Sequence, residues 1–346
     1  MLAEAGLLAA PLRREFGGLG LGTEVGSTLP LLLLLKQLGR GNLAIGRVYE
    51  GHVNALQLIQ TFGTRQQIEA YAADVRDRHK LFGVWNTEAA DGVKIVPING
   101  GQYRLEGAKT FASGAGYVER PFVNGALPDG GWQMCIVPMD EVSTDIDPSW
   151  WQPLGMRASG SYRVDFSGVE LAPNALIGAP GDYYRQPWLT VGVIRFAAVQ
   201  LGAAEALFDA TREYLRLLDR IDDPYQRSRV AEMAIAIESG NLWLRGAAQM
   251  ADKLLQADTS ENTVAFIAYA NMVRTAIETI CINILQMTER AVGARGLLRP
   301  HPFERIGRDL TLYLRQPAPD AALANVGRYA LETPTVAGKL WFHDVH

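Results

Sequence analysis

The spacing of apolar residues changes twice along the chain, and these changes set the fold class. Residues 1–82 repeat apolar side chains with the period of a helix, residues 83–175 form short runs separated by turns, and the helical period returns at Gln186. Helices repeat every 3.6 residues and half-buried strands every 2 residues. A chain of 346 residues also exceeds the size of one compact core. The pattern predicts an α+β multidomain protein with boundaries at 1–82, 83–178 and 179–346.

The first segment is predicted to be an all-α domain. Its densest apolar run, Leu29 to Leu38, is apolar on nearly all sides, which is typical of a buried helix. Thr64 is a favourable N-cap for a following helix. The predicted helices are Ala3–Leu8, Leu29–Leu38, Arg47–Phe62 and Arg65–Asp77.

The middle segment is predicted to be an antiparallel β-barrel or sandwich, because its runs are short and no helical pattern separates them. Asn99-Gly-Gly101 is a hairpin signal, and Pro97 predicts that the strand 95–98 lies at a sheet edge. The other predicted strands are 102–106, 121–127, 132–137 and 162–166.

The last segment is predicted to be a four-helix bundle, since long helical patterns are joined by short connections. The Asp223-Pro224 pair is a start signal for the second of them. The predicted helices are 189–218, 225–255, 263–292 and 305–314, with a further one over 321–331 after Pro317 and Pro319.

Composition excludes several classes of function. The net charge of −4 argues against a nucleic-acid partner. No apolar run approaches the ~20 residues of a membrane span, and Met1 to Leu12 lacks the basic start of a signal peptide. Cys135 and Cys281 fit no metal-ligand spacing, so no metal is expected and both are interpreted as reduced core residues. These features predict a cytoplasmic protein without a membrane partner.

Short motifs occur in one order along almost the whole chain, and together they resemble the acyl-CoA dehydrogenase family. The order of helices, β domain and helical bundle is also that of the family. The motifs are Glu15–Gly20, Phe62–Gln67, Thr87-Glu88, Gly107–Gly114, Leu154–Ser159, Phe166–Pro173, Gly293–Gly296 and Arg308-Asp309. Family members usually carry one more helix before the equivalent of Met1, so the first helix is expected to be missing.

The resemblance implies an FAD site, with FMN or no flavin as alternatives, and a homodimer or homotetramer in which a neighbour completes that site. Phe111 would form the aromatic wall against the flavin ring, and Ser113 would replace the family's threonine. Other residues would contact the cofactor's phosphates. The family's phosphate-binding arginine aligns with Leu218 here, so Arg220 and Arg290 would have to supply the positive charge instead. The residues implied to bind cofactor are Trp85, Asn86, Thr87, Phe111, Ser113, Gly293, Arg220 and Arg290, and Arg195 is implied to bind substrate.

The two positions at which the family places its catalytic glutamate hold no carboxylate. The position after Arg308-Asp309 and Tyr313 is Pro317, and the earlier one is Ile194. Neither side chain accepts a proton, and general base catalysis contributes about 10²–10⁴-fold to such a reaction. Asp320 and His52 are weak substitutes, the latter because a lone histidine on a helix is more often structural.

Three functions remain open. The first is an FAD-dependent oxidoreductase that acts on an acyl thioester or a carrier-bound intermediate with an unidentified base. The second is a reduced-flavin-dependent monooxygenase, which needs no such base but usually has a histidine near Arg308-Asp309, where this chain has none. The third is a non-catalytic flavin- or acyl-binding homologue. The pair Trp150-Trp151 and Trp188 either line an apolar pocket or belong to the core.

Overall fold

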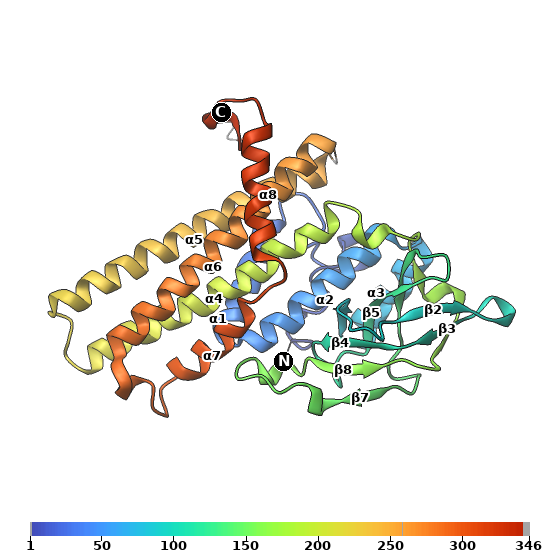
Figure 1. The fold of residues 1–346 in the computed structure, drawn as a ribbon, viewed down its shortest axis with the longest axis horizontal. Helices are drawn as coiled ribbons and strands as arrows, with labels where there is room; N and C mark the ends of the chain where they lie inside the picture. The colour runs from blue at the N-terminus through green and yellow to red at the C-terminus, as the bar shows by residue number, and fades with distance from the viewer. Residues whose placement is uncertain (1, 258, 342–346) are drawn as a thin grey trace. The chain divides into compact units, whose positions relative to one another are not determined.

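The structure is a computed structural model that describes residues 2–257 and 259–341. The chain divides into two compact units. The β unit contains residues up to 27, 47–153 and 157–189, and the helical unit contains residues 28–46, 154–156 and those from 190 onward. The predicted layout of N-terminal helices, middle strands and C-terminal helices is confirmed (Figure 1). The three domain boundaries given above stay a prediction.

The β unit contains two sheets. The larger sheet has the strand order β10-β6-β5-β2-β3-β9, with β1 pairing to β5 off this path, and the smaller has the order β4-β8-β7. Most pairs are antiparallel as predicted, but β1 and β2 both run parallel to β5. The larger sheet consists of β1 (Phe82–Trp85), β2 (Lys94–Pro97), β3 (Tyr103–Glu106), β5 (Arg120–Ala126), β6 (Trp132–Ile136), β9 (Glu170–Leu171) and β10 (Leu176–Ile177). The smaller consists of β4 (Ala108–Ala112), β7 (Asp145–Asp147) and β8 (Tyr162–Asp165).

The hairpin signal is confirmed and the edge prediction for the strand that contains Pro97 is wrong. Asn99–Gly101 joins the antiparallel strands β2 and β3, and Gly100 and Gly101 adopt the positive φ that this turn requires. The strand β2 also pairs with β5, so it has neighbours on both sides. That second pairing involves only Lys94, and Pro97 lies beyond it, where its missing N–H is not needed.

Two helices of the β unit pack on the larger sheet. They are α2 (Leu43–Phe62, from 47 onward) and α3 (Arg65–Asp77), and α3 begins at a capping box in which Thr64 and Gln67 satisfy each other's backbone N–H. The predicted helix Ala3–Leu8 is wrong, because this segment forms consecutive turns in which Gly6 has a φ of 69°. Side chains of this segment, of α2 and α3, and of β1, β5 and β6 share one core.

The helical unit confirms the predicted bundle helices. Its helices are α1 (Thr28–Gly41), α4 (Trp188–Leu217, from 190 onward), α5 (Pro224–Gln256), α6 (Ser260–Gly296), α7 (Phe303–Tyr313) and α8 (Pro319–Glu332). Glycine allows α1 and α4 to approach closely, since a Cβ at Gly39 would strike the Val199 carbonyl and one at Gly202 would strike that of Lys36. Asp223 caps α5 through the backbone N–H of Tyr225, as its position predicted.

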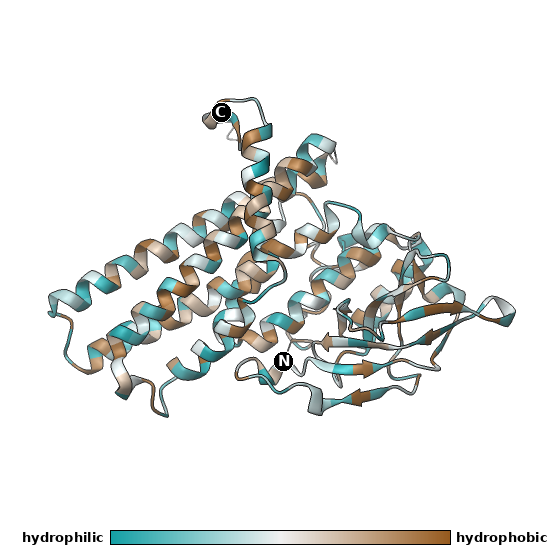
Figure 2. Cartoon of the chain, in the orientation of Figure 1, coloured by the Kyte–Doolittle hydropathy of each residue, from teal (hydrophilic) through white to brown (hydrophobic). Residues whose placement is uncertain are grey.

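Two helices, Trp188–Leu217 and Ser260–Gly296, are long and apolar enough to cross a membrane by length and composition. However, 67% and 56% of their most apolar stretches are buried within the protein. Apolar and hydrophilic residues alternate along these helices (Figure 2). This pattern is typical of core helices in a bundle.

Candidate functional site

An aromatic cluster, in which Phe111 is exposed and Trp150 and Trp151 are half-buried, lies beside the smaller sheet. Phe111 sits at a bulge of β4, its side chain is 48% exposed, and its φ is 52°. The ring meets Trp150 edge to face at a centroid distance of 4.9 Å and Trp151 at 5.7 Å. Positive φ is a true outlier for a bulky residue, and such strain persists where function requires it. Asp147 fixes the turn before the two tryptophans by accepting from the Ser149 N–H at 2.9 Å.

Ser113 belongs to a chain of three buried hydroxyls. Its Oγ lies 2.8 Å from that of Ser161, which lies 2.7 Å from that of Ser159. The Gly114 N–H also donates to the Ser159 carbonyl at 2.7 Å. The two motifs that contain these serines therefore meet in the structure. The prediction missed Ser159 and Ser161, although their spacing of two residues beside a glycine was the available signal.

Trp85, Asn86 and Thr87 follow one another at the end of β1 but differ in role. The Trp85 ring is 1% exposed, and its N–H donates to the Ser113 carbonyl at 3.0 Å. The Trp85 ring therefore belongs to the core, and only the backbone of Trp85 is left to contact a cofactor. Thr87 is exposed, and its carbonyl accepts from the Thr110 N–H at 2.9 Å. The shared cleft for Thr87, Phe111 and Ser113 stays a prediction.

The helical unit has a cavity of about 350 Å³ whose rim is rich in arginine. Arg220 lines it, together with Arg212, Arg216 and Arg227. Gln226 is 3% exposed and lines the same cavity, and its Oε1 has no hydrogen-bond partner among the described residues. An unpaired buried amide oxygen costs roughly 1–3 kcal/mol unless a donor binds it. The Gln226 oxygen therefore suits a ligand with a hydrogen-bond donor, whereas the arginines of the rim suit an anion.

The other two distal residues lie near this cavity. The Gln226 amide donates to the Ala291 carbonyl at 3.5 Å, and Arg290 is the residue before Ala291. Gly293 breaks the helical geometry of α6 with φ 60° and ψ −172°. The structure thus gathers Arg220, Arg290 and Gly293 at one end of the helical unit, and their contact with a cofactor stays a prediction.

Neither base position offers a proton acceptor. Ile194 is fully buried in α4, and Pro317 is exposed before α8, with its carbonyl bonded to Arg274 at 2.7 Å. Asp320 is exposed in the first turn of α8. Arg195 is 1% exposed in α4, and its predicted contact with substrate stays a prediction.

His52 is a structural residue, which corrects its selection as a substitute base. It is fully buried, its Nε2 donates to the Leu8 carbonyl at 2.8 Å, and its Nδ1 accepts from the Phe82 N–H at 3.0 Å. Burial lowers the pKa of its imidazole to about 4. Both ring nitrogens are occupied, so no lone pair is available to a substrate.

The segment 154–156 belongs to the helical unit because the Arg308-Asp309 motif holds it. Arg308 donates to the Leu154 carbonyl at 2.7 Å, and Asp309 accepts from the Met156 N–H at 2.6 Å. A Cβ at Gly155 would strike the Arg308 carbonyl. These contacts give a structural reason for the glycine, the arginine and the aspartate in the two motifs.

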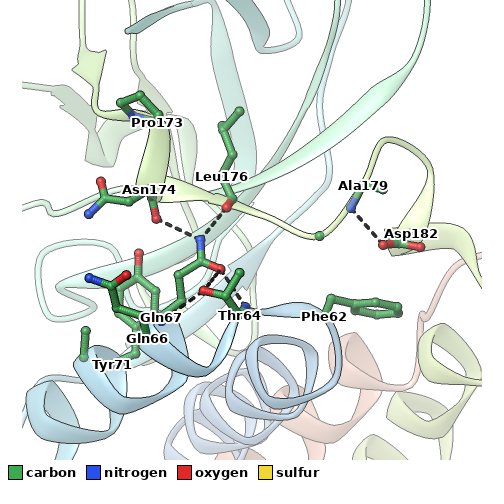
Figure 3. Close-up of a pocket in the computed structure, with 12 residues that line it drawn as sticks. Phe62, Thr64, Gln66, Gln67, Tyr71, Pro173, Asn174, Leu176, Ala179 and Asp182 are labelled. Atoms are coloured by element: carbon green, nitrogen blue, oxygen red, sulfur yellow. Dashed lines mark hydrogen bonds between the residues drawn. The ribbon is translucent and has the colours of Figure 1, made fainter. Parts of the chain in front are cut away.

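A further cavity of about 870 Å³ lies in the β unit, between the start of α3 and the segment 173–182. Figure 3 shows the Gln67 side chain reaching from α3 to the carbonyls of Asn174 and Leu176. None of the described residues that line it is among the predicted site residues. The cofactor predictions therefore concern other surfaces.

Comparison with known proteins identifies the family. The model for the acyl-CoA dehydrogenase N-terminal domain matches residues 1–77, and the model for the acyl-CoA dehydrogenase C-terminal domain matches residues 194–314. The chain therefore belongs to the acyl-CoA dehydrogenase family, as its motifs predicted.

Its relatives include two kinds of enzyme. Dibenzothiophene monooxygenase of Rhodococcus erythropolis is 24% identical, over 95% of this chain and 85% of that protein. The probable acyl-CoA dehydrogenase YngJ of Bacillus subtilis (strain 168) is 26% identical, over 90% and 83%. The crystal structure of TdsC from Paenibacillus sp. A11-2 with FMN and indole has a TM-score of 0.86 at 21% identity, covering 95% of this chain and 88% of that one.

The residues present fit a flavin, the cofactor that the family implies. Phe111 offers an exposed aromatic face, and the buried Ser113 hydroxyl lies two residues away. The arginine side chains that line the cavity of the helical unit are donors of the kind that a phosphate group needs. The aromatic and the anionic parts of the cofactor therefore each have matching residues.

Replacing Phe111 with asparagine is expected to reduce flavin retention with little change in stability. Asparagine tolerates a φ of 52° and relieves backbone strain of about 1–3 kcal/mol. The same change removes two aromatic contacts of about 0.5–1.5 kcal/mol each, which offsets that gain. Thermal unfolding and equilibrium dialysis against FAD and FMN measure the two effects. Unchanged dialysis binding would show that the Phe111 ring does not contact the cofactor.

Proposed function

We propose that this protein is a reduced-flavin-dependent monooxygenase. The observation that supports this best is the combination of a flavin-compatible face at Phe111 and Ser113 with Ile194 and Pro317 at the two base positions. A monooxygenase needs no base at the α-carbon of a thioester. The relatives named dibenzothiophene monooxygenase, which align over 95% of the chain, favour the same function.

This ranking reverses the order that the sequence suggested. The sequence placed a thioester oxidoreductase first because no histidine follows Arg308-Asp309. That absence is a departure from the usual monooxygenase pattern, yet the missing carboxylates count more, because a dehydrogenase cannot remove the α-proton without a base. The thioester oxidoreductase and the monooxygenase would both be flavoproteins of the acyl-CoA dehydrogenase family.

The cofactor is a flavin, FAD or FMN, which a separate reductase would supply in reduced form. When bound, it supplies two electrons to dioxygen, so that one oxygen atom enters the substrate and the other leaves as water. Phe111 would support its ring, the Ser113–Ser161–Ser159 hydroxyls would hold or pass a proton beside it, and Arg220 would bind its phosphate.

The substrate proposed first is a planar aromatic compound that contains sulfur or nitrogen. Trp150 and Trp151 stack nearly parallel at an interplanar angle of 14°, and both meet Phe111, so an apolar aromatic wall lies beside the proposed ring site. Among the similar proteins, one acts on dibenzothiophene and one structure contains indole. An acyl thioester or carrier-bound substrate is the alternative.

Incubation with a flavin reductase, NADH, FMN and labelled dioxygen is expected to place one labelled oxygen atom in dibenzothiophene or indole. Mass spectrometry of the product measures this incorporation. A reaction with catalase and superoxide dismutase controls for oxidation by free reduced oxygen species. Product only in the absence of those enzymes, or no product from any heteroaromatic compound tested, would contradict the proposal.

A non-catalytic flavin- or acyl-binding homologue is the remaining alternative, and the same incubation distinguishes it by the absence of product.

A homodimeric or homotetrameric assembly and a cytoplasmic location are further proposals. The free state of both cysteines agrees with a reducing compartment.

A further inference from the structure

A buried ion pair lies beside the residues that are proposed to bind the flavin ring. The Lys109 side chain, on β4 two residues before Phe111, is completely buried. Its ammonium donates to the Glu88 carboxylate and to the Asn86 carbonyl, the latter at 3.2 Å. The proposed reaction does not use either charge. A fully buried lysine is rare, so its presence requires a reason.

The main chain that Lys109 holds is attached at several points. Asn124 on β5 is fully buried, and its Nδ2 donates to the Asn86 Oδ1 at 3.3 Å. The Thr87 carbonyl accepts from the Thr110 N–H at 2.9 Å. The segment Asn86–Glu88 lies past the end of β1, where the strand ladder no longer supports it. These side-chain and backbone contacts therefore hold the segment Asn86–Glu88 where the hydrogen bonds of the sheet end.

Two neighbours offset part of the cost of burying the ammonium. Burial lowers the pKa of the Lys109 ammonium, and the hydrogen bond and charge of Glu88 only partly oppose that effect. The Trp132 ring lies 5.8 Å from the ammonium and adds a cation–π contact. Gly92 leaves the space that the Glu88 carboxylate occupies, because a Cβ there would collide with it.

Stability alone does not account for this arrangement. Buried ion pairs contribute little or nothing compared with apolar residues of the same volume, because both charges lose their hydration. A pair of that kind is explained better by what it holds in place. Here the held group is the Asn86–Thr87 main chain, which lies next to β4, the strand that bears Phe111 and Ser113.

We propose that Glu88 and Lys109 form a positioning pair that fixes the Asn86–Thr87 main chain for flavin binding. The inference rests on the proposed flavin site and adds two residues that would act through Asn86 and Thr87 instead of touching the cofactor. Without the ammonium, the Asn86 carbonyl loses its charged donor, and the segment relaxes away from the conformation that binds the ring.

The chain contains a matched control in the helical unit. Lys36 pairs with Glu205 at 2.7 Å, and the two side chains are 9% and 15% exposed. Lys36 also donates to a second group, the Asn241 Oδ1, at 2.7 Å. Like Lys109, it is a buried lysine with one carboxylate and one neutral acceptor, but no predicted flavin contact lies on its helix α1. Its removal should loosen the fold without altering the flavin site.

Flavin titration of full-length Lys109→Met and Lys36→Met tests the proposal. Both variants are expected to lower the thermal midpoint. Only Lys109→Met is expected to weaken FAD or FMN binding, by about tenfold or more, and to shift the visible absorption of the bound flavin. Glu88→Gln keeps an oxygen acceptor at a side chain that is 25% exposed, so it should fold and weaken binding less, by about threefold.

Each outcome has a defined meaning. Lys109→Met or, if that variant does not fold, Glu88→Gln with wild-type flavin affinity would overturn the positioning role. Equal weakening in Lys36→Met would overturn it too, because the effect would then be general loosening. The double variant Glu88→Gln/Lys109→Met should bind flavin no more weakly than Lys109→Met if the two residues act as a unit. A wild-type protein that binds no flavin would instead contradict the proposed function itself.

Discussion

Replacing Arg120 with methionine is expected to lower the free energy of unfolding by about 3 kcal/mol. Its guanidinium is 4% exposed and contacts three carboxylates: Asp74 at 2.8 Å, Asp140, and Glu141 at 3.2 Å. Removing one partner of a buried pair leaves an uncompensated charge, at a cost of about 3–5 kcal/mol. The lower end applies because Arg78 still pairs with Asp74 at 2.7 Å. Chemical denaturation of the purified protein measures the loss.

Arg65→Met is the control for this experiment, because Arg65 pairs with Glu69 on the same unit but is 71% exposed. Exposed pairs of this spacing contribute about 0.3–0.5 kcal/mol.

The stability of the protein in acid gives a second readout of the Arg120 network. Burial acts to raise the pKa of Asp140, but hydrogen bonds from Arg120 and Lys80 outweigh it and lower the pKa to about 2. This stabilisation is present above the ordinary pKa near 4 and is lost as the pH falls towards 2. Equal losses in the two arginine variants would contradict the assignment of a buried network.

Saturated straight-chain acyl-CoA thioesters are expected to bleach the bound flavin at least about 100-fold more slowly than a carboxylate-containing dehydrogenase would. Ile194 and Pro317 cannot take the α-proton, and His52 is enclosed by Leu8 and Phe82. Anaerobic absorbance at the flavin maximum measures the reaction, and reduction by dithionite confirms that the flavin is competent. Rapid bleaching would reveal another base, and Asp320→Asn would then be the first variant to test.

The fold could be predicted closely because its signals are local. Thr64 placed the start of α3, and Asp223 with Pro224 placed that of α5. The failures involve information that lies elsewhere in the chain. The N-terminal segment has helical periodicity, but the positive φ of Gly6 favours turns. So does the hydrogen bond from Tyr49 on α2 to the Leu7 carbonyl. Which strand pairs with β2 depends on β5, where Ala126 is the partner of Lys94, and no local pattern contains that pairing.

The candidate site was less predictable, for a physical reason. The resemblance to the family selected Phe111 and Ser113, but burial decides the role of a polar side chain, and burial is a property of the folded chain. His52 looked reactive by type and is enclosed in the core, whereas Lys109 drew no functional interpretation and proves to be fully buried beside a carboxylate. Gln226 became notable only when its Oε1 was found unpaired in a cavity.

The alternation of the two units along the chain has a consequence for synthesis on the ribosome. Helix α1 is made early, yet its partners α4 and α5 lie beyond residue 187, and its Gly39, Lys36 and Thr28 contact Val199, Glu205 and Asp252. At about 5–20 residues per second, roughly 10–40 s pass before the last of these partners has been made. During that time Gly39, Lys36 and Thr28 lack the partners that they have in the folded protein. The contacts that α1 makes in the helical unit therefore form only after most of the β unit has been made.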